Sequence, residues 1–314
     1  MAVTSADQLP LRALPTRVFA TVPAPMLVLG SMVGIQLGSA VAKYLLELTG
    51  ATTAAGVRLL LAGLIALLVW RPALRVDRRA LPAIAGFGAA IAGMNLCFYA
   101  AIDRIPLGMA VTIEFLGPLT VALASSRRRL DAMWVVLAGA GVVLLMRSGG
   151  PVSWTGVLFA VAAGIGWGSY VACSAVLGER TSDSDGLALA MAFGGLMALP
   201  FVVADAGALL ADPLLPLCAL GVAVLSSLVP HLVELEALRR MPTSTFGVLM
   251  SAEPAVAAGI GFLLLGEELR VAQWAGIGLV VLATVGSTRT SREADAPPPT
   301  ADLRPEPALA HARD

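Results

Sequence analysis

Long apolar runs follow one another through almost the whole chain, and this pattern limits the possible folds more than any other feature. A helix needs roughly 20 mostly apolar residues to cross the hydrocarbon core of a bilayer. Runs of about this length, joined by short connections rich in arginine, glycine and proline, lie at 24–46, 52–70, 80–102, 107–125, 130–146, 154–177, 186–204, 214–238, 243–265 and 270–287. The sequence therefore predicts an all-α membrane protein with ten transmembrane helices.

The composition excludes several classes of protein. The chain of 314 residues is 58% hydrophobic and 13% charged, with a mean hydropathy of +0.85, whereas a soluble domain has about 25% charged residues. Lys+Arg and Asp+Glu balance at 21 each, so the chain lacks the basic excess of a nucleic-acid binder. The high apolar content also excludes an ordinary soluble enzyme and a disordered chain.

The distribution of arginines predicts the orientation. Cytoplasmic connections of membrane proteins are enriched in Lys and Arg. If the N-terminus is cytoplasmic, most arginines fall inside and the outer connections carry only Arg104, Arg147 and Arg270. Both termini are then cytoplasmic, with residues 1–23 as an N-terminal segment. Residues 288–314 are rich in proline and charge, which predicts a disordered cytoplasmic tail.

The two halves of the chain repeat each other. The segment 34–39 aligns with 164–169, and further along, in nearly the same register, Pro118 aligns with Pro254. The sequence thus predicts two five-helix repeats, at 24–147 and 154–287. Because five is odd, the second repeat enters the membrane from the opposite side. Inverted repeats of this kind build transporters with a binding site near the midplane.

Two stretches carry a resemblance to a known family. They are RIPLGMAVTIEFLGP at 104–118 and RMPTSTFGVLMSAEP at 240–254, the second followed by Leu-Gly-Glu at 265–267. The chain resembles the EamA-type branch of the drug/metabolite transporter superfamily over residues 24–287, and within it most closely the threonine/homoserine exporters. The resemblance implies a ten-helix carrier of the bacterial inner membrane with a central cavity, which exports amino acids or similar small metabolites.

Charged residues inside the apolar runs are the candidates for function, because each charge at the bilayer centre costs at least about 2.5 kcal/mol. The candidates for substrate binding or proton coupling are Glu114, Glu253, His231, Glu234, Arg58 and Lys43. Glu236 lies four residues before Arg240, and this spacing predicts an interfacial ion pair instead. Possible cavity-lining residues are Gln36, Tyr44, Asn95, Tyr99, Trp167 and Tyr170.

Two prolines predict interruptions at matching places in the repeats. Pro118 cannot donate a hydrogen bond to the carbonyl of residue 114, and Pro254 does the same to residue 250. A kink is therefore expected beside Glu114 and beside Glu253.

Each candidate also has a structural alternative. The acids could pair with Arg58 or Lys43 and only hold helices together, and His231 could form a local pair with Glu234 three residues on. Gly34, Gly38, Gly164 and Gly168 are best interpreted as sites of close helix packing.

The sequence favours a secondary exporter of amino acids such as threonine or homoserine, driven by proton exchange through alternating access. The alternative is an efflux carrier for drugs, cationic compounds or other metabolites. An enzyme is not expected, because Ser169 lacks the Gly-x-Ser-x-Gly context. The expected partners are a small-molecule substrate, protons and the lipid bilayer, with no nucleic acid, metal or cofactor.

Overall fold

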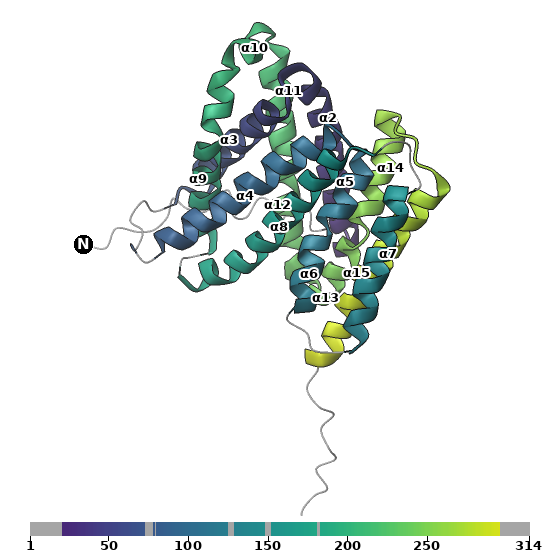
Figure 1. The fold of residues 1–314 in the computed structure, drawn as a ribbon. Helices are drawn as coiled ribbons and strands as arrows, with labels where there is room; N and C mark the ends of the chain where they lie inside the picture. The colour runs from purple at the N-terminus through teal and green to yellow at the C-terminus, as the bar shows by residue number, and fades with distance from the viewer. Residues whose placement is uncertain are drawn as a thin grey trace, which may run out of the picture.

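The computed structural model describes residues 21–72, 78, 80–124, 129–147, 152–180 and 183–295, and these residues form helices without any strand. Figure 1 shows the arrangement of the helices. Their bounds are α2 Ala24–Thr49, α3 Ala51–Trp70, α4 Leu81–Ile102, α5 Leu107–Glu114, α6 Leu116–Ala124, α7 Arg129–Arg147, α8 Trp154–Arg180, α9 Asp183–Ala204, α10 Ala206–Ala211, α11 Leu214–Ala223, the π-helical turn η1 Val224–Leu228, α12 Val229–Arg240, α13 Thr243–Met250, α14 Glu253–Leu265 and α15 Val271–Asp295.

Seven helical segments of the described residues are long and apolar enough to cross a membrane: 24–49, 51–69, 81–102, 154–171, 185–204, 245–265 and 271–289. Three shorter apolar segments, at 107–121, 133–147 and 214–227, complete the series. Many large apolar side chains of these helices are exposed, including Leu158, Ile165 and Leu263. An apolar exterior of this kind is stable in lipid.

The helix ends follow from proline and glycine. Pro23, Pro106 and Pro242 precede α2, α5 and α13, where proline sets a backbone angle suited to a helix start. α14 ends at Leu265 and is capped by Gly266, whose φ of 64° lies in the left-handed region that glycine adopts without strain. α15 runs to Asp295, beyond the predicted end at 287, so residues 288–295 are helical and do not begin a disordered tail. The rest of the predicted tail, 296–314, and residues 1–20 of the predicted N-terminal segment lie outside the described part.

Helices from the two halves of the chain pack in pairs. α3 packs on α9, α4 on α8, α2 on α12 and α7 on α15. Small residues permit the close approach: a Cβ at Gly63 would lie only 2.8 Å from the carbonyl oxygen of Met191, across the α3–α9 contact. Such small-residue contacts are the usual way in which helices associate in membranes.

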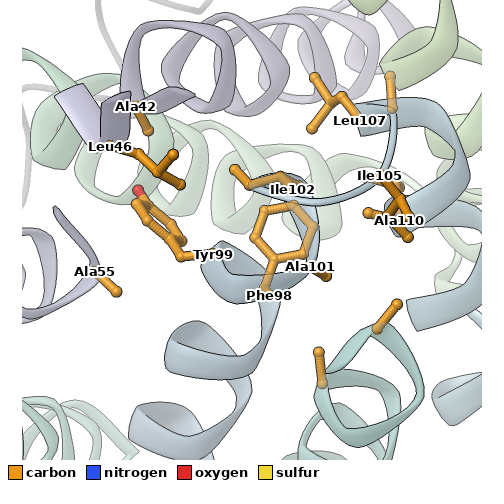
Figure 2. Packing of buried hydrophobic residues seen from close by; sticks show 14 of the residues in the cluster. Ala42, Leu46, Ala55, Phe98, Tyr99, Ala101, Ile102, Ile105, Leu107 and Ala110 are labelled. Carbon is orange, nitrogen blue, oxygen red and sulfur yellow. The ribbon is translucent and has the colours of Figure 1, made fainter. Parts of the chain in front are cut away.

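The largest buried cluster lies where α2, α3, α4 and α5 meet. Figure 2 shows the ring of Tyr99 beside Ala42 and Leu46, with Phe98 and Ile102 on the same helix. Tyr99 is fully buried, and its hydroxyl group has no hydrogen-bond partner among the described residues. This buried polar group belongs to the side of the cluster that faces the candidate site, where Arg58 lies over the Tyr99 ring.

Candidate functional site

Two helical segments are interrupted inside the protein, and each places a carboxyl group there. α5 ends at Glu114 and α6 begins at Leu116, while α13 ends at Met250 and α14 begins at Glu253. Each interruption precedes a proline, Pro118 or Pro254, which removes a backbone donor. Glu114 and Glu253 are both buried, with exposed fractions of 7% and 6%.

Gln36 on α2 holds Glu253. Its Nε2 donates a hydrogen bond of 3.3 Å to Oε1 of Glu253. The other carboxylate oxygen of Glu253 and the side-chain oxygen of Gln36 are buried without a partner among the described residues. Buried polar atoms are rarely left without a partner. These two oxygens are therefore available to a ligand that donates hydrogen bonds.

Arg58 on α3 brings a positive charge to the same region. Its Nη2 donates to the carbonyl oxygen of Ser226 at 3.1 Å, and its Nε approaches Oγ of Ser227 at 3.5 Å. Both serines belong to the π-helical turn η1, a kind of interruption that is frequent at functional sites. The guanidinium group lies 5.7 Å from the ring centroid of Tyr99 and within electrostatic range of Glu114.

Glu234 on α12 adds a third carboxyl group. It lies beside the hydroxyl group of Ser31 and within electrostatic range of Glu253 and Tyr170. Its Oε1 is buried without a partner among the described residues. His231 lies on the same helix one turn earlier, but its side chain falls outside the described part of the structure.

These side chains form one connected group, which we call the central cluster: Gln36, Arg58, Tyr99, Glu114, Glu234 and Glu253. It combines three carboxyl groups with one guanidinium group and four buried polar atoms that lack partners among the described residues. Ionised carboxyl groups in such proximity repel one another, and a bound cation or proton relieves the repulsion. The central cluster is therefore suited to a small polar ligand that carries a positive group.

Lys43 lies elsewhere. Its Nζ forms an ion pair of 2.5 Å with Oε1 of Glu267, and Oε2 of Glu267 accepts a hydrogen bond of 2.8 Å from the backbone of Leu107. Glu267 thereby joins α2, the start of α5 and the connection after α14. Lys43 is thus a counter-ion, as the structural alternative predicts. Its partner is Glu267, and not Glu114 or Glu253.

The remaining candidates are dispersed. Tyr44 is exposed, with an exposed fraction of 58%. Asn95 is buried and donates to the backbone carbonyl one turn earlier, at 2.9 Å. Trp167 packs edge-on against Phe115, beside the α5–α6 interruption, with ring centroids 5.0 Å apart. Tyr170 packs on a phenylalanine of α4 at 4.7 Å and lies near the central cluster.

Two structural expectations from spacing agree with the contacts. Nε of Arg240 donates to Glu236 at 2.7 Å, so the predicted ion pair forms. Gly38 and Gly164 both lie at close helix contacts: a Cβ at Gly164 would meet the carbonyl oxygen of Glu114 at 2.8 Å, and one at Gly38 would touch Ser226.

Sequence reasoning missed four residues around these sites: Ser31, Ser226, Ser227 and Glu267. The serines carry no charge and stand in apolar runs, so no pattern distinguishes them. Glu267 entered the sequence analysis only as part of the Leu-Gly-Glu stretch, two residues beyond the predicted helix 243–265. Its position near a helix end concealed its contact with Lys43.

Comparison with known proteins identifies the family. The EamA-like transporter family matches residues 154–289. The threonine/homoserine exporter RhtA of Escherichia coli is 40% identical over 277 residues, which cover 85% of this chain and 92% of that protein. The exporter RhtA of Salmonella typhimurium is 41% identical over 278 residues, with the same coverage. The chain belongs to the EamA-like transporter family.

The fold of this EamA-like transporter agrees with a solved structure, described only as the crystal structure of a protein. It superposes with a TM-score of 0.54 at 16% sequence identity, covering 87% of this chain and 99% of the other. The family and the apolar helices make the chain a multi-pass transporter of the bacterial inner membrane, and not an enzyme.

Proposed function

We propose that this transporter exports threonine, homoserine and similar small amino acids through the central cluster. The observation that carries the proposal is the meeting of three buried carboxyl groups and Arg58 at two interrupted helices, with polar atoms left without partners among the described residues. The names of the relatives from Escherichia coli and Salmonella typhimurium support this choice of substrate.

The proposed topology has ten transmembrane helices in two inverted repeats, 24–147 and 154–287, with both termini in the cytoplasm. The helix contacts support it. In this topology α2 corresponds to α8, α4 to α12 and α6 to α14. The contact of α4 with α8 therefore corresponds to that of α12 with α2, and the contact of α6 with α8 to that of α14 with α2. The contacts α3–α9 and α7–α15 each join two equivalent helices. This is the set of contacts expected from a pseudo-two-fold axis in the membrane plane.

An amino acid suits the charges of the central cluster. Its ammonium group can donate hydrogen bonds to Glu253 and Glu234, which each have an acceptor oxygen without a partner among the described residues. Its carboxylate can reach Arg58, whose planar guanidinium binds carboxylates in a bidentate manner. Protons and the ammonium group compete for the same carboxyl groups, and this competition couples export to the proton gradient.

The decisive experiment is counterflow of labelled threonine in reconstituted vesicles, with and without a proton gradient. Glu114→Gln and Glu253→Gln should each abolish the response to the gradient, because an amide cannot exchange a proton in this way. Glu47→Gln is the matched control, since Glu47 is exposed on α2. Gradient-driven threonine counterflow that persists in both amide variants would contradict the proposal.

The alternative substrate class is a drug or another organic cation. The excess of carboxyl groups over guanidinium groups in the central cluster favours it. Cells that express the transporter would then resist toxic cations but not toxic threonine analogues. The amino acid proposal predicts the reverse, and it also predicts that Arg58→Gln eliminates protection against the analogues.

A further inference from the structure

A cavity lies apart from the charges of the central cluster. Its volume is about 450 Å³, within the range of about 300–1,000 Å³ that is typical of small-molecule sites. It opens between the segments that precede α5, α8 and α15. The residues that line it are Arg104, Ile105, Pro106, Met109, Val152, Ser153, Glu268, Leu269, Arg270 and Gln273.

The cavity contains charges of both signs that are free to bind a ligand. Glu268 and Arg270 are exposed, and neither side chain forms an ion pair within the described part of the chain. Arg104 is held in place: it donates to the carbonyl oxygen of Ala100 at 2.6 Å and pairs with Asp103 at 3.0 Å. The guanidinium group of Arg104, which already has two partners, thus faces the same cavity as Arg270 and Glu268. Arg270 and Glu268 have no ion-pair partner among the described residues.

The backbone around the cavity supplements the two arginines. α8 and α15 both begin at its wall, and their positive ends favour a negative group there. Ser153 accepts a hydrogen bond of 3.2 Å from the backbone of Gly156, and Gln273 accepts one of 2.9 Å from the backbone of Arg270. These caps fix the backbone of both helix starts at the cavity wall.

We propose that this cavity is a second binding site for α-amino acids, on the outer face of the membrane. Arg270 and Arg104 bind the carboxylate and Glu268 binds the ammonium group, so that the site recognises the zwitterion. The outer location and the amino acid class rest on the proposed function, which places the connections before α5, α8 and α15 outside the cell. An exported amino acid would occupy this site as it leaves, or rebind to it from outside.

The test uses a single cysteine as a reporter. Leu269→Cys is introduced after Cys97, Cys173 and Cys218 are replaced by alanine, and a membrane-impermeant thiol reagent is applied to right-side-out vesicles. Labelling should occur from the outside, and L-threonine should slow it. N-acetyl-L-threonine, which lacks the ammonium group, and L-threoninol, which lacks the carboxylate, should each need about tenfold higher concentrations, because each loses one charge-assisted interaction.

The variants separate this site from the central cluster. In the reporter background, Arg270→Gln and Glu268→Gln should each raise the protective threonine concentration about tenfold. Arg289→Gln is the matched control, because Arg289 is an exposed arginine in the far half of α15, the helix that begins just after Arg270. Protection that is equal in Arg270→Gln and Arg289→Gln, or equal for threonine and its N-acetyl derivative, would overturn the proposal.

Parallel counterflow measurements distinguish the two proposals. Threonine counterflow without any threonine protection of the introduced thiol in the Leu269→Cys protein overturns the outer site and leaves the proposed function intact. Threonine protection that depends on Arg270 in a protein that moves no amino acid supports the outer site and contradicts the proposed function. Labelling only in inverted vesicles overturns the outer location.

Discussion

Gly117 on α6 and Gly164 on α8 face each other beside the interruption that carries Glu114, and this contact allows a sharp test of the packing. A Cβ at position 117 would overlap the carbonyl oxygen of Gly164 and lie 2.6 Å from its carbonyl carbon. Ordinary carbon contacts are about 3.5–4.0 Å. Because the obstructing atoms are backbone, Gly117→Ala must push the two helices apart by roughly 1 Å.

The free energy of this change can be worked out from two opposing effects. Overpacking of a close contact costs about 1–3 kcal/mol, while glycine to alanine in a helix gains up to about 1 kcal/mol. Because the helix gain is common to both glycine-to-alanine variants, the Gly117→Ala protein should be about 1–3 kcal/mol less stable than a variant with alanine at an open site. Gly259→Ala on α14 is the matched control, because nothing lies within 4 Å of a Cβ there; it should retain or gain stability.

The assay is the loss of the folded, monodisperse fraction on heating in detergent, combined with threonine counterflow. Gly117→Ala should melt a few degrees below Gly259→Ala. Its counterflow should fall by about tenfold or more, because the displaced backbone carries the Glu114 carboxyl group with it. If the two alanine variants had equal stability and equal counterflow, the close approach of α6 to α8 at this point would be refuted.

Three further predictions concern single contacts. Lys43→Met should cost about 1–3 kcal/mol, because it removes the counter-ion of the half-buried Glu267; adding Glu267→Gln should recover part of the loss in the same melting assay, and strictly additive losses would contradict the ion pair. Arg58→Lys keeps the charge but loses the planar contacts with the π-helical turn, so counterflow should fall about tenfold with little change in melting; wild-type counterflow would contradict this role. Gln36→Leu removes the donor that holds Glu253, and threonine should then be half-saturating at a roughly tenfold higher concentration; an unchanged value in the counterflow assay would contradict it.

The helices themselves were largely predictable, for a physical reason. A lipid-facing helix must be apolar over its whole length, so composition alone reveals it, and the bounds of α3, α4 and α7 differ from the predicted runs by only a residue or so. The π-helical turn η1 was not predictable. It is stabilised by contacts between distant segments, including the bonds from Arg58 to Ser226 and Ser227, and its sequence, VLSSL, is compatible with an ordinary helical turn.

The assembly of the site was harder to predict than its members. Gln36 and Lys43 are seven residues apart and therefore share a face of α2, but they differ in depth by about 10 Å. Gln36 meets Glu253, whereas Lys43 meets Glu267 just beyond the far end of α14. The sequence indicates that cationic and acidic side chains lie within the apolar runs. Which acidic residue Gln36 or Lys43 contacts depends on how helices from different parts of the chain align along the membrane normal.

The proposed repeat accounts for two similar backbone interruptions that carry different side chains. In the alignment that matches the two prolines after the interruptions, Glu114 corresponds to Met250, and Glu253 corresponds to Gly117. One repeat therefore carries its carboxyl group just before the interruption and the other just after it. The alignment of 34–39 with 164–169 places Ala188 at the position of Arg58, so the guanidinium group has no counterpart. In the proposed topology, a duplicated scaffold supplies the two interruptions, and divergence of single residues gives the central cluster a cationic and an anionic side.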